Sequence, residues 1–337
     1  MKTKIALLAL FLALNGNLDA QPLKNIIFST KGGGEAMLPL MISERLGFNR
    51  EEGFRSEIVV TRGTIATQAL LSGSVGYTNA AVLPAILNGA RLKYIVNSAD
   101  KPAQYLVSSA KITSLKQLVG KTVAISDFSG NAYLIMKDLL ARHNVAIGEI
   151  KLRVFGESSV RLNALLSDSV DATMLVYEQV KRAQAKGYRL LAYSGDHISG
   201  LSPALCTTDA RIKESPDEVY RVVRATLKGQ LFWYRNPETI KFLMEALALS
   251  DEAEVRDIWE ERTRRASEIA QIGRATEDAM LINLERVKEQ LKLGGAPIKG
   301  KDVTIEQVYD FSFVKRAYDE LVAQKWDAMK YRYVKKS

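Results

Sequence analysis

Cysteine and histidine are scarce in this chain of 337 residues. Cys206 is the single cysteine, and His143 and His197 are the two histidines. One cysteine excludes a disulfide framework and a cysteine-based zinc site, and two histidines are too few for most metal or acid–base constellations. No Ser/His/Asp arrangement, nucleophile elbow or glycine motif for a nucleotide phosphate occurs either. We therefore expect neither a metal nor a cofactor, and we do not expect an enzyme.

Long apolar runs are absent after the first residues. Lys2 and Lys4 precede an unbroken apolar run at residues 5–14, which is too short to span a bilayer as a helix. A polar stretch then ends at Ala20, and this order is typical of a secretory signal peptide. We expect residues 1–20 to be a signal peptide cleaved near Ala20 and the mature chain to be periplasmic. A retained anchor is the alternative.

Basic residues outnumber acidic ones, 47 against 38, which gives a net charge of +9. The excess is spread along the chain apart from a basic tail at residues 330–336. Charge alone would permit a nucleic-acid partner, but an exported chain rarely meets one, so we expect no nucleic acid. An anionic solute or an anionic lipid surface is the simpler partner for a basic exported protein.

Short apolar strands alternate with helices from residue 25 to residue 208. The first unit is a strand at 25–29, a helix at 35–46 and a strand at 57–61, and parallel strands joined in this way need cover on both faces. About ten strands are expected in this part of the chain, which suits two sheets better than one. From residue 215 onward the pattern is helical. The sequence therefore predicts an α/β fold with two sheets and a helical C-terminal tail.

One eight-residue sequence occurs twice in similar form. Residues 69–76 read ALLSGSVG, and residues 164–171 read ALLSDSVD. In both, a helix ends, a tight turn follows and an apolar strand begins. The repetition supports two lobes of similar build.

The stretch at residues 61–84 contains two turns in close succession, each followed by a helix. Arg62, Gly63 and Thr64 close a strand and open one helix, and Asn79 is expected to cap a second helix that begins at Ala80. The first N–H groups of a helix have no partner inside it, so a helix start after a strand can bind an anion or a carbonyl oxygen. Ordinary capping is the alternative for these residues.

Four passages in the same order resemble one known family. They are residues 43–60, 69–90 (ALLSGSVGYTNAAVLPAILNGA), 114–140 (SLKQLVGKTVAISDFSGNAYLIMKDLL) and 164–187 (ALLSDSVDATMLVYEQVKRAQAKG). The family is that of the periplasmic solute-binding proteins of ATP-driven importers in the sulfonate/nitrate/taurine and thiamine-pyrimidine group. The resemblance implies a two-lobed type II periplasmic binding fold in which each lobe is a mainly parallel sheet flanked by helices. One lobe would comprise residues 21–109 plus 206–337 and the other residues 110–205, with the ligand in the cleft between them.

The resemblance also implies that ligand contacts lie at the carboxyl ends of the strands, where open α/β sheets generally bind ligands. In the first lobe these candidates are Thr30, Gly33, Gly34, Arg62, Gly63, Thr64, Asn79 and Ala80. In the second lobe they are Ser126, Ser129, Gly130, Asn131, Tyr177 and Glu178. Arg62 would suit a flat anion such as a sulfonate or carboxylate. The Glu178 carboxylate would instead favour a ligand with donor groups, such as an amine or a pyrimidine, so the charge of the ligand stays open.

As a member of that family, the chain would capture a small organic molecule, most simply an anionic one, by closure of its lobes and deliver it to a permease. Its partners would be the membrane permease and ATPase subunits of an importer, and it would act as a monomer without a cofactor. A ligand sensor for a receptor kinase is one alternative. A pyrimidine-synthesis-type enzyme on the same fold is another, although those relatives are cytosolic and this chain has a predicted export signal.

Overall fold

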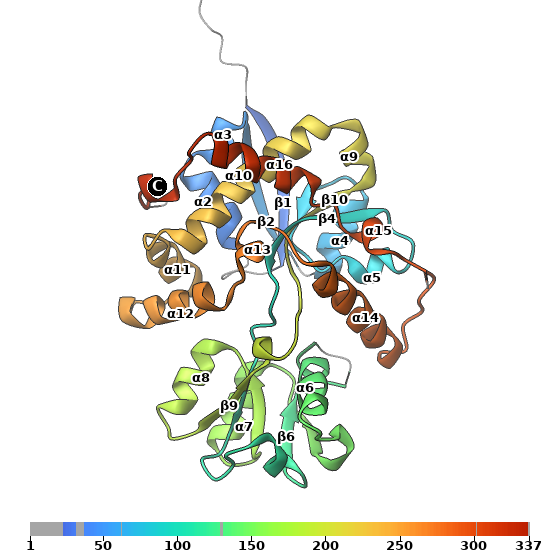
Figure 1. The fold of residues 1–337 in the computed structure, drawn as a ribbon, viewed down its shortest axis with the longest axis vertical. Helices are drawn as coiled ribbons and strands as arrows, with labels where there is room; N and C mark the ends of the chain where they lie inside the picture. The colour runs from blue at the N-terminus through green and yellow to red at the C-terminus, as the bar shows by residue number, and fades with distance from the viewer. Residues whose placement is uncertain (1–22, 32–36, 62, 129–130, 301, 336–337) are drawn as a thin grey trace, which may run out of the picture.

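The computed structural model describes residues 23–31, 37–61, 63–128, 131–300 and 302–335. Two five-stranded sheets form two lobes, one above the other in Figure 1, and two extended segments connect them. The C-terminal helices surround the upper lobe, which contains the first sheet. Within the described ranges, no helix combines the length and the apolar character needed to cross a membrane.

The first sheet comprises β1 (Lys24–Lys31), β2 (Phe54–Thr61), β3 (Tyr77–Thr78), β4 (Leu92–Ala99) and β10 (Ser202–Thr208). Their order across the sheet is β2-β1-β3-β10-β4. β1 is parallel to β2 and to β3, whereas β10 is antiparallel to both of its neighbours. Four strands therefore point in one direction, and β10 runs against them.

The second sheet comprises β5 (Tyr105–Ser108), β6 (Thr122–Ile125), β7 (Lys151–Val154), β8 (Ala172–Leu175) and β9 (Arg189–Tyr193), in the order β7-β6-β8-β5-β9. β6 is parallel to β7 and β8, and β5 is antiparallel to β8 and β9. The reversed strand in each sheet, β10 or β5, is the one by which the chain enters that lobe from the other. The prediction of two mainly parallel sheets is confirmed.

The lobe boundaries differ from the prediction at two strands, because the predicted boundary between residues 205 and 206 falls inside β10, which pairs with strands of the first sheet. Ending the first lobe at residue 109 would place β5 in it, but β5 pairs only with strands of the second sheet. The connections between the sheets are therefore residues 100–104 and 194–201. The apolar sequence of β5 predicts a buried strand but carries no information about which sheet it joins.

Helices cover both sheets. Those between the first-sheet strands are α2 (Leu38–Arg45), α3 (Phe48–Glu51), α4 (Gly63–Leu71) and α5 (Leu83–Ile86). The second lobe adds η2 (Leu115–Leu118), α6 (Asn131–Arg142), η3 (Ile147–Glu149), α7 (Ser158–Leu166) and α8 (Tyr177–Gln184), and the connection after β9 contains η4 (Ser194–Asp196). The C-terminal part consists of α9 (Asp209–Glu214), α10 (Pro216–Arg235), α11 (Thr239–Leu247), α12 (Glu252–Arg265), α13 (Glu268–Gln271), α14 (Glu277–Leu293), α15 (Ile305–Val308), α16 (Ser312–Ala323) and η5 (Ala328–Lys330).

The repeated eight-residue sequence forms the same turn in both lobes. Gly73 and Asp168 occupy the same place in it, and both have a left-handed backbone, with φ of 77° and 54°. The two serines that flank this residue have their hydroxyls 2.9 Å apart in the first lobe and 3.0 Å apart in the second. The turn joins α4 to β3 and α7 to β8. The repeat therefore marks equivalent positions in the two lobes.

Helix α10 forms the centre of the first lobe's core. Pro216 opens it, and Asp217 and Glu218 occupy the first turn, where the helix dipole favours acidic side chains. From Val219 onward most of its residues are buried, and the helix packs against α2 and α16. Cys206 in β10 is fully buried, as expected of a small apolar core residue.

Glu218 ties α10 to the first sheet. It is 5% exposed and accepts hydrogen bonds from the Tyr77 hydroxyl at 3.0 Å and from Arg211 Nη1 at 2.6 Å, and it also pairs with Lys24. Burial by itself would raise the pKa of Glu218, but the hydrogen bonds from Lys24, Arg211 and Tyr77 outweigh it and hold the pKa below its usual value.

A carboxyl whose folded pKa is depressed contributes stability above its unfolded pKa of about 4.3, and this contribution is lost as the pH falls through the folded value. We therefore expect the free energy of unfolding of Glu218→Gln at pH 7 to be about 1–3 kcal/mol below that of the parent, so the variant should unfold at a lower urea concentration. The difference should shrink as the pH is lowered below about 4. Urea titrations at several pH values would measure it, and a difference independent of pH would contradict the assignment.

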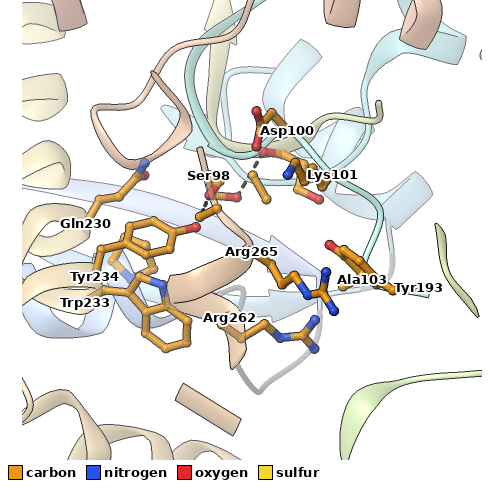
Figure 2. Close-up of a pocket in the computed structure, with 14 residues that line it drawn as sticks. Ser98, Asp100, Lys101, Ala103, Tyr193, Gln230, Trp233, Tyr234, Arg262 and Arg265 are labelled. Atoms are coloured by element: carbon orange, nitrogen blue, oxygen red, sulfur yellow. Dashed lines mark hydrogen bonds between the residues drawn. The ribbon is translucent and has the colours of Figure 1, made fainter. Parts of the chain in front are cut away.

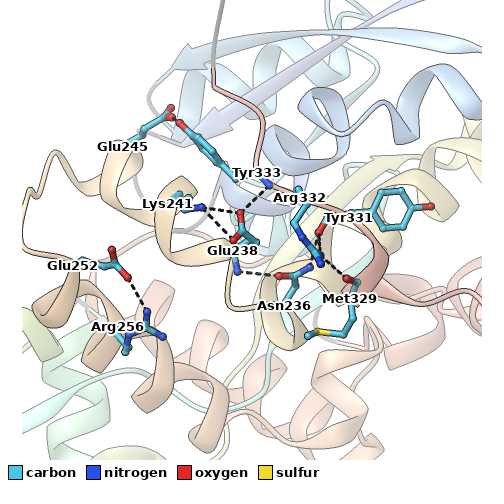
Figure 3. Close-up of polar contacts among 10 residues, drawn as sticks. All are labelled: Asn236, Glu238, Lys241, Glu245, Glu252, Arg256, Met329, Tyr331, Arg332 and Tyr333. Carbon is cyan, nitrogen blue, oxygen red and sulfur yellow. Dashed lines mark hydrogen bonds and ion pairs between the residues drawn. The ribbon is translucent and has the colours of Figure 1, made fainter.

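The basic C-terminal tail folds back onto α11 (Figure 3). The Asn236 carboxamide, at the end of α10, donates to the Ala328 and Tyr331 carbonyls at 2.8 and 3.1 Å. The Tyr333 backbone N–H donates to Glu238 at 3.2 Å, and its hydroxyl is hydrogen-bonded to Glu245. Two tyrosines of the tail thus pack on the first lobe, while the side chains of Lys330, Arg332 and Lys335 are exposed.

Candidate functional site

The carboxyl ends of three first-sheet strands meet at one edge, as the sequence predicts. Thr30 lies opposite Val60 in the β1–β2 pair, and Ser29 lies opposite Thr78 in the β1–β3 pair. The Asn79 N–H donates to the Ser29 carbonyl at 3.4 Å. Two of the candidates, Thr30 and Asn79, therefore come together here, and both are buried.

The expected helix start at Asn79 is wrong. Helix α5 begins at Leu83, and Val82 precedes it without a side-chain cap. Pro84 sets this later start, because its fixed φ suits the first turn of a helix. Ala80 is fully buried and its N–H donates to the Thr78 hydroxyl at 3.1 Å, so that N–H is not available to a ligand.

Two further first-lobe candidates, Gly63 and Thr64, lie at the start of α4. This helix begins at Gly63, which makes Thr64 an exposed residue of its first turn and not a cap. The remaining candidates of that lobe, Gly33, Gly34 and Arg62, lie outside the described residues, as do Ser129 and Gly130 of the second lobe.

The described second-lobe candidates that follow strands also share one sheet edge. β6 and β8 are parallel, with Val123 opposite Ala172, so the half-buried Ser126 after β6 and Tyr177 after β8 leave the sheet on the same side. Asn131 is the first residue of α6. Tyr177 and Glu178 form the first turn of α8.

Tyr177 reaches helix α12 of the C-terminal part. Its hydroxyl donates to Asp257 Oδ2 at 3.2 Å, and its ring lies 5.4 Å from that of Tyr105. Lys181, one turn further along α8, pairs with the same Asp257 at 2.8 Å. Burial, together with Asp257, raises the pKa of Tyr177, so its hydroxyl stays neutral. The start of α8 therefore faces a helix that sequence reasoning did not connect with the site.

Helix α12 bridges the two lobes through Glu261 and Arg265. Glu261 is 5% exposed and accepts from the Tyr105 hydroxyl and from Arg265 Nε, both at 3.0 Å. Arg265 Nη1 also donates to Asp196 in the second connection at 2.6 Å. Its guanidinium lies over the Tyr193 ring, 4.3 Å from the ring centre.

Helix α14 forms a second bridge. Arg286 Nη2 lies 3.2 Å from Asp138 on α6, and its Nη1 donates to the Ser199 carbonyl at 3.0 Å. Lys137, also on α6, pairs with Glu289 on α14. In Figure 1, α12 and α14 lie on opposite sides of the two connecting segments. The angle between the lobes is therefore held by polar contacts on both sides of the hinge.

A cavity of about 260 Å³ opens where α12 meets the connecting segments, and we name it the interlobe cavity. Its lining residues are Pro39, Ser98, Ala99, Asp100, Lys101, Ala103, Tyr193, Ser202, Gln230, Trp233, Tyr234, Arg262, Arg265 and Ala266. They come from strands of both lobes, from the first connection and from helices α2, α10 and α12 with the residue after α12. Pro39 lies in the first turn of α2.

The lining of the interlobe cavity is basic with aromatic walls. It contains Lys101, Arg262 and Arg265 against one acidic residue, Asp100, and Arg265 is also paired with Glu261 and Asp196 outside the lining. Figure 2 shows the two guanidinium groups on the side nearest Tyr193, with the rings of Trp233 and Tyr234 on the other side. Burial raises the pKa of Tyr193 to about 12, and Arg262 and Arg265 beside it oppose the rise.

Gln230 adds a polar group to the wall of the interlobe cavity. Its side-chain amide donates to the carbonyls of Asn97 at 2.9 Å and Ala270 at 2.7 Å, and its Oε1 is buried with no hydrogen-bond partner among the described residues. The cavity therefore offers basic side chains, aromatic rings and one acceptor without a partner among the described residues. Within the described part of the chain, no group of three or more His, Cys, Asp or Glu side chains could hold a metal.

Residues 35–240 match the family model described as NMT1/THI5-like, which is more than half of the chain. The chain belongs to the NMT1/THI5-like family. No curated protein sequence matches it in a sequence comparison.

Solved structures give the fold of this NMT1/THI5-like protein. The putative periplasmic sulfonate-binding protein SsuA of Methylobacillus flagellatus KT has a TM-score of 0.70 and 16% identity over 89% of this chain and 96% of that one. The periplasmic aliphatic sulphonate-binding protein SsuA of Escherichia coli has a TM-score of 0.66 and 15% identity over 84% of this chain and 91% of that one. A variant of DSZB in complex with biphenyl-2-sulfinic acid has a TM-score of 0.64 and 14% identity over 88% of this chain and 99% of that one. At these identities the likeness shows the fold, and it confirms the periplasmic binding protein fold expected from the sequence.

DSZB is described as a desulfurization enzyme. The same fold therefore carries both binding proteins and an enzyme, and it does not by itself separate the two classes for this chain.

Proposed function

We propose that this protein is the extracytoplasmic solute-binding component of an ABC-type importer, and that it takes a small organic anion into the interlobe cavity. The observation that carries the proposal is the cationic, ring-walled lining made by Arg262, Arg265, Trp233 and Tyr234 between two lobes. Family membership and the SsuA-like fold support the same role.

A sulfonate or carboxylate suits this lining. Guanidinium groups form paired, charge-assisted hydrogen bonds with such flat anions. The rings of Trp233 and Tyr234 would pack on an apolar tail, and the unpartnered Gln230 Oε1 would accept from a donor on the ligand. A cavity of about 260 Å³ is slightly smaller than a drug-sized pocket, so the ligand would be small.

Closure of the lobes would bring the strand-end candidates of both sheets onto the same ligand. Thr30, Thr64, Ser126 and Glu178 are the described candidates that we keep in this role. The predicted signal peptide supports export, and we propose a membrane permease and its ATPase as partners of a monomeric protein. A permease gene beside this one would support the importer, whereas a receptor-kinase gene there would support a sensor that uses the same cavity.

A ligand screen on residues 21–337 tests the function. Alkane and aryl sulfonates, taurine, nitrate, aromatic carboxylates and pyrimidines would each be added to the protein during thermal unfolding. A ligand at 100 times its dissociation constant stabilises the folded state by about 2.7 kcal/mol. We expect a sulfonate or carboxylate to raise the unfolding temperature and to be recovered unchanged. Consumption of the added compound would replace the binding role with an enzymatic one.

Arg262→Ala should weaken binding of that anion by about 10- to 150-fold, because a charge-assisted hydrogen bond contributes about 1.5–3 kcal/mol. The matched control is Arg256→Ala on the same helix, since Arg256 is exposed and pairs only with Glu252 one turn away among the described residues. Calorimetric titration of both variants would measure the ratio of affinities. Arg62→Ala tests the sequence-predicted cation in the same way. Equal affinities for the Arg262 and Arg256 variants would remove the interlobe cavity from ligand binding.

A further inference from the structure

A second cavity, of about 140 Å³, lies between β4, α5, α14 and the segment before α16, and we name it the α14 cavity. Its lining residues are Ala81, Leu83, Pro84, Tyr94, Val96, Asn97, Leu201, Asn283, Val287, Gln290, Tyr309 and Phe311. None of them lines the interlobe cavity. The linings of the two cavities change over between Asn97 and Ser98 in β4 and between Leu201 and Ser202 at the start of β10. The α14 cavity is therefore a separate site beside the hinge.

The walls of the α14 cavity are aromatic and aliphatic. The rings of Tyr94 and Tyr309 stack with centres 5.4 Å apart and planes 25° from parallel, and Phe311 lies 5.8 Å from Tyr309. Leu83, Val96, Leu201 and Val287 supply aliphatic surface. No acidic or basic side chain is among its lining residues in the described part of the chain. An ion placed there would lose its hydration without a compensating charge, so the lining favours a neutral molecule.

A few polar groups occupy one side of this cavity. Asn283 and Gln290 project from the same face of α14, with Val287 between them. The Asn283 amide donates to the Tyr309 hydroxyl at 2.9 Å. Burial raises the pKa of Tyr309 to about 12, so this hydroxyl keeps its proton and can donate it. The half-buried Gln290 carboxamide makes no hydrogen bond within the described residues, and it can both donate and accept.

We propose that the α14 cavity binds a small neutral molecule with one aromatic ring and one polar substituent, of which phenol is the simplest example. The size supports this class, because an apolar protein cavity of about 150 Å³ holds benzene. The stacked tyrosines and Phe311 contact the ring. Gln290 and the Tyr309 hydroxyl bind the substituent. The inference does not depend on the cargo of the interlobe cavity.

Three ring compounds test the proposal on the full mature chain: phenol, benzene and benzenesulfonate. We expect saturable one-to-one binding of phenol at about millimolar concentration, as suits a ligand of this size, in both the parent and Arg262→Ala. A crystal soaked with phenol should place the ring beside Tyr309. Benzenesulfonate has the same ring but a charge, and should not compete with phenol for this site. Displacement of phenol from Tyr309 by benzenesulfonate, or only non-saturable binding of phenol, would overturn the proposal.

Three variants complete the test. Val287→Trp places an indole in the cavity and should weaken phenol binding by about tenfold or more, while Leu281→Trp adds the same group at an exposed position of α14 and should leave it unchanged. Gln290→Leu keeps the bulk and removes the polar partner, so it should weaken phenol more than benzene even if Val287→Trp fails to fold. Equal phenol affinity in all three variants would contradict the site.

Discussion

Replacing Glu261 by alanine should lower the free energy of unfolding by about 1–3 kcal/mol, the usual cost of leaving a buried hydrogen-bond donor without its acceptor. Glu261 is 5% exposed, and it accepts from the Tyr105 hydroxyl and from Arg265 Nε at the junction between the lobes. Without the carboxylate, Tyr105, which is itself 1% exposed, would have a buried hydroxyl with no acceptor. Urea unfolding followed by tryptophan fluorescence would measure the loss.

The neighbouring residue provides the control for this experiment. Glu260 has the same side chain on the same helix but is exposed, so Glu260→Ala should change the free energy of unfolding by less than about 0.5 kcal/mol. Glu261→Gln separates charge from shape, because the amide oxygen can still accept from Tyr105 while Arg265 loses the charge of Glu261 and keeps that of Asp196. We expect it to fall between the parent and Glu261→Ala. If Glu260→Ala and Glu261→Ala unfolded at the same urea concentration, the lobe junction would not depend on this carboxylate.

The order of strands and helices could be predicted because it depends on local pattern. Most of the apolar strands are followed by a helix with a turn residue at its end, and these signals lie within a few residues of one another. The repeated turn at Gly73 and Asp168 is of this kind. The start of α5 was misplaced because Pro84 decided it over Asn79. The sheet that β5 joins could not be predicted from local pattern, because its partners β8 and β9 lie far along the chain.

The site could be predicted only where strand ends define it. Thr30 with Asn79, and Ser126 with Tyr177, meet at sheet edges because parallel strands end together. Helix α12 was not connected with the site for a physical reason. The sequence around Glu261 and Arg265 is rich in charges of both signs, which is typical of a solvated helix face. The burial of Glu261 depends on Tyr105, which lies 156 residues earlier in the chain, and no local pattern encodes that contact.

Gly229→Ala should destabilise the first lobe by about 3 kcal/mol, at the upper end of the usual cost of overpacking a core. Gly229 lies in α10 where this helix crosses α2, and a β-carbon added there would stand 2.1 Å from the Pro39 carbonyl oxygen and 3.2 Å from the Ser43 nitrogen. Both are backbone atoms, so the clash cannot be relieved by rotation of a flexible side chain. Alanine gains about 1 kcal/mol of helix propensity over glycine, which is too little to offset a displacement of α2.

The same substitution should also weaken ligand binding, because Pro39 lines the interlobe cavity together with Gln230 and Trp233 of α10. Gly148→Ala is the control, since a β-carbon at Gly148 meets no atom within 4 Å and its backbone is not left-handed. We expect this control to be neutral or slightly stabilising. Urea unfolding and ligand titration of both variants would show whether the two effects occur together at Gly229. A Gly229→Ala protein as stable as the parent would mean that α2 and α10 are not in fixed contact, and the cavity wall would then have to be assigned to other elements.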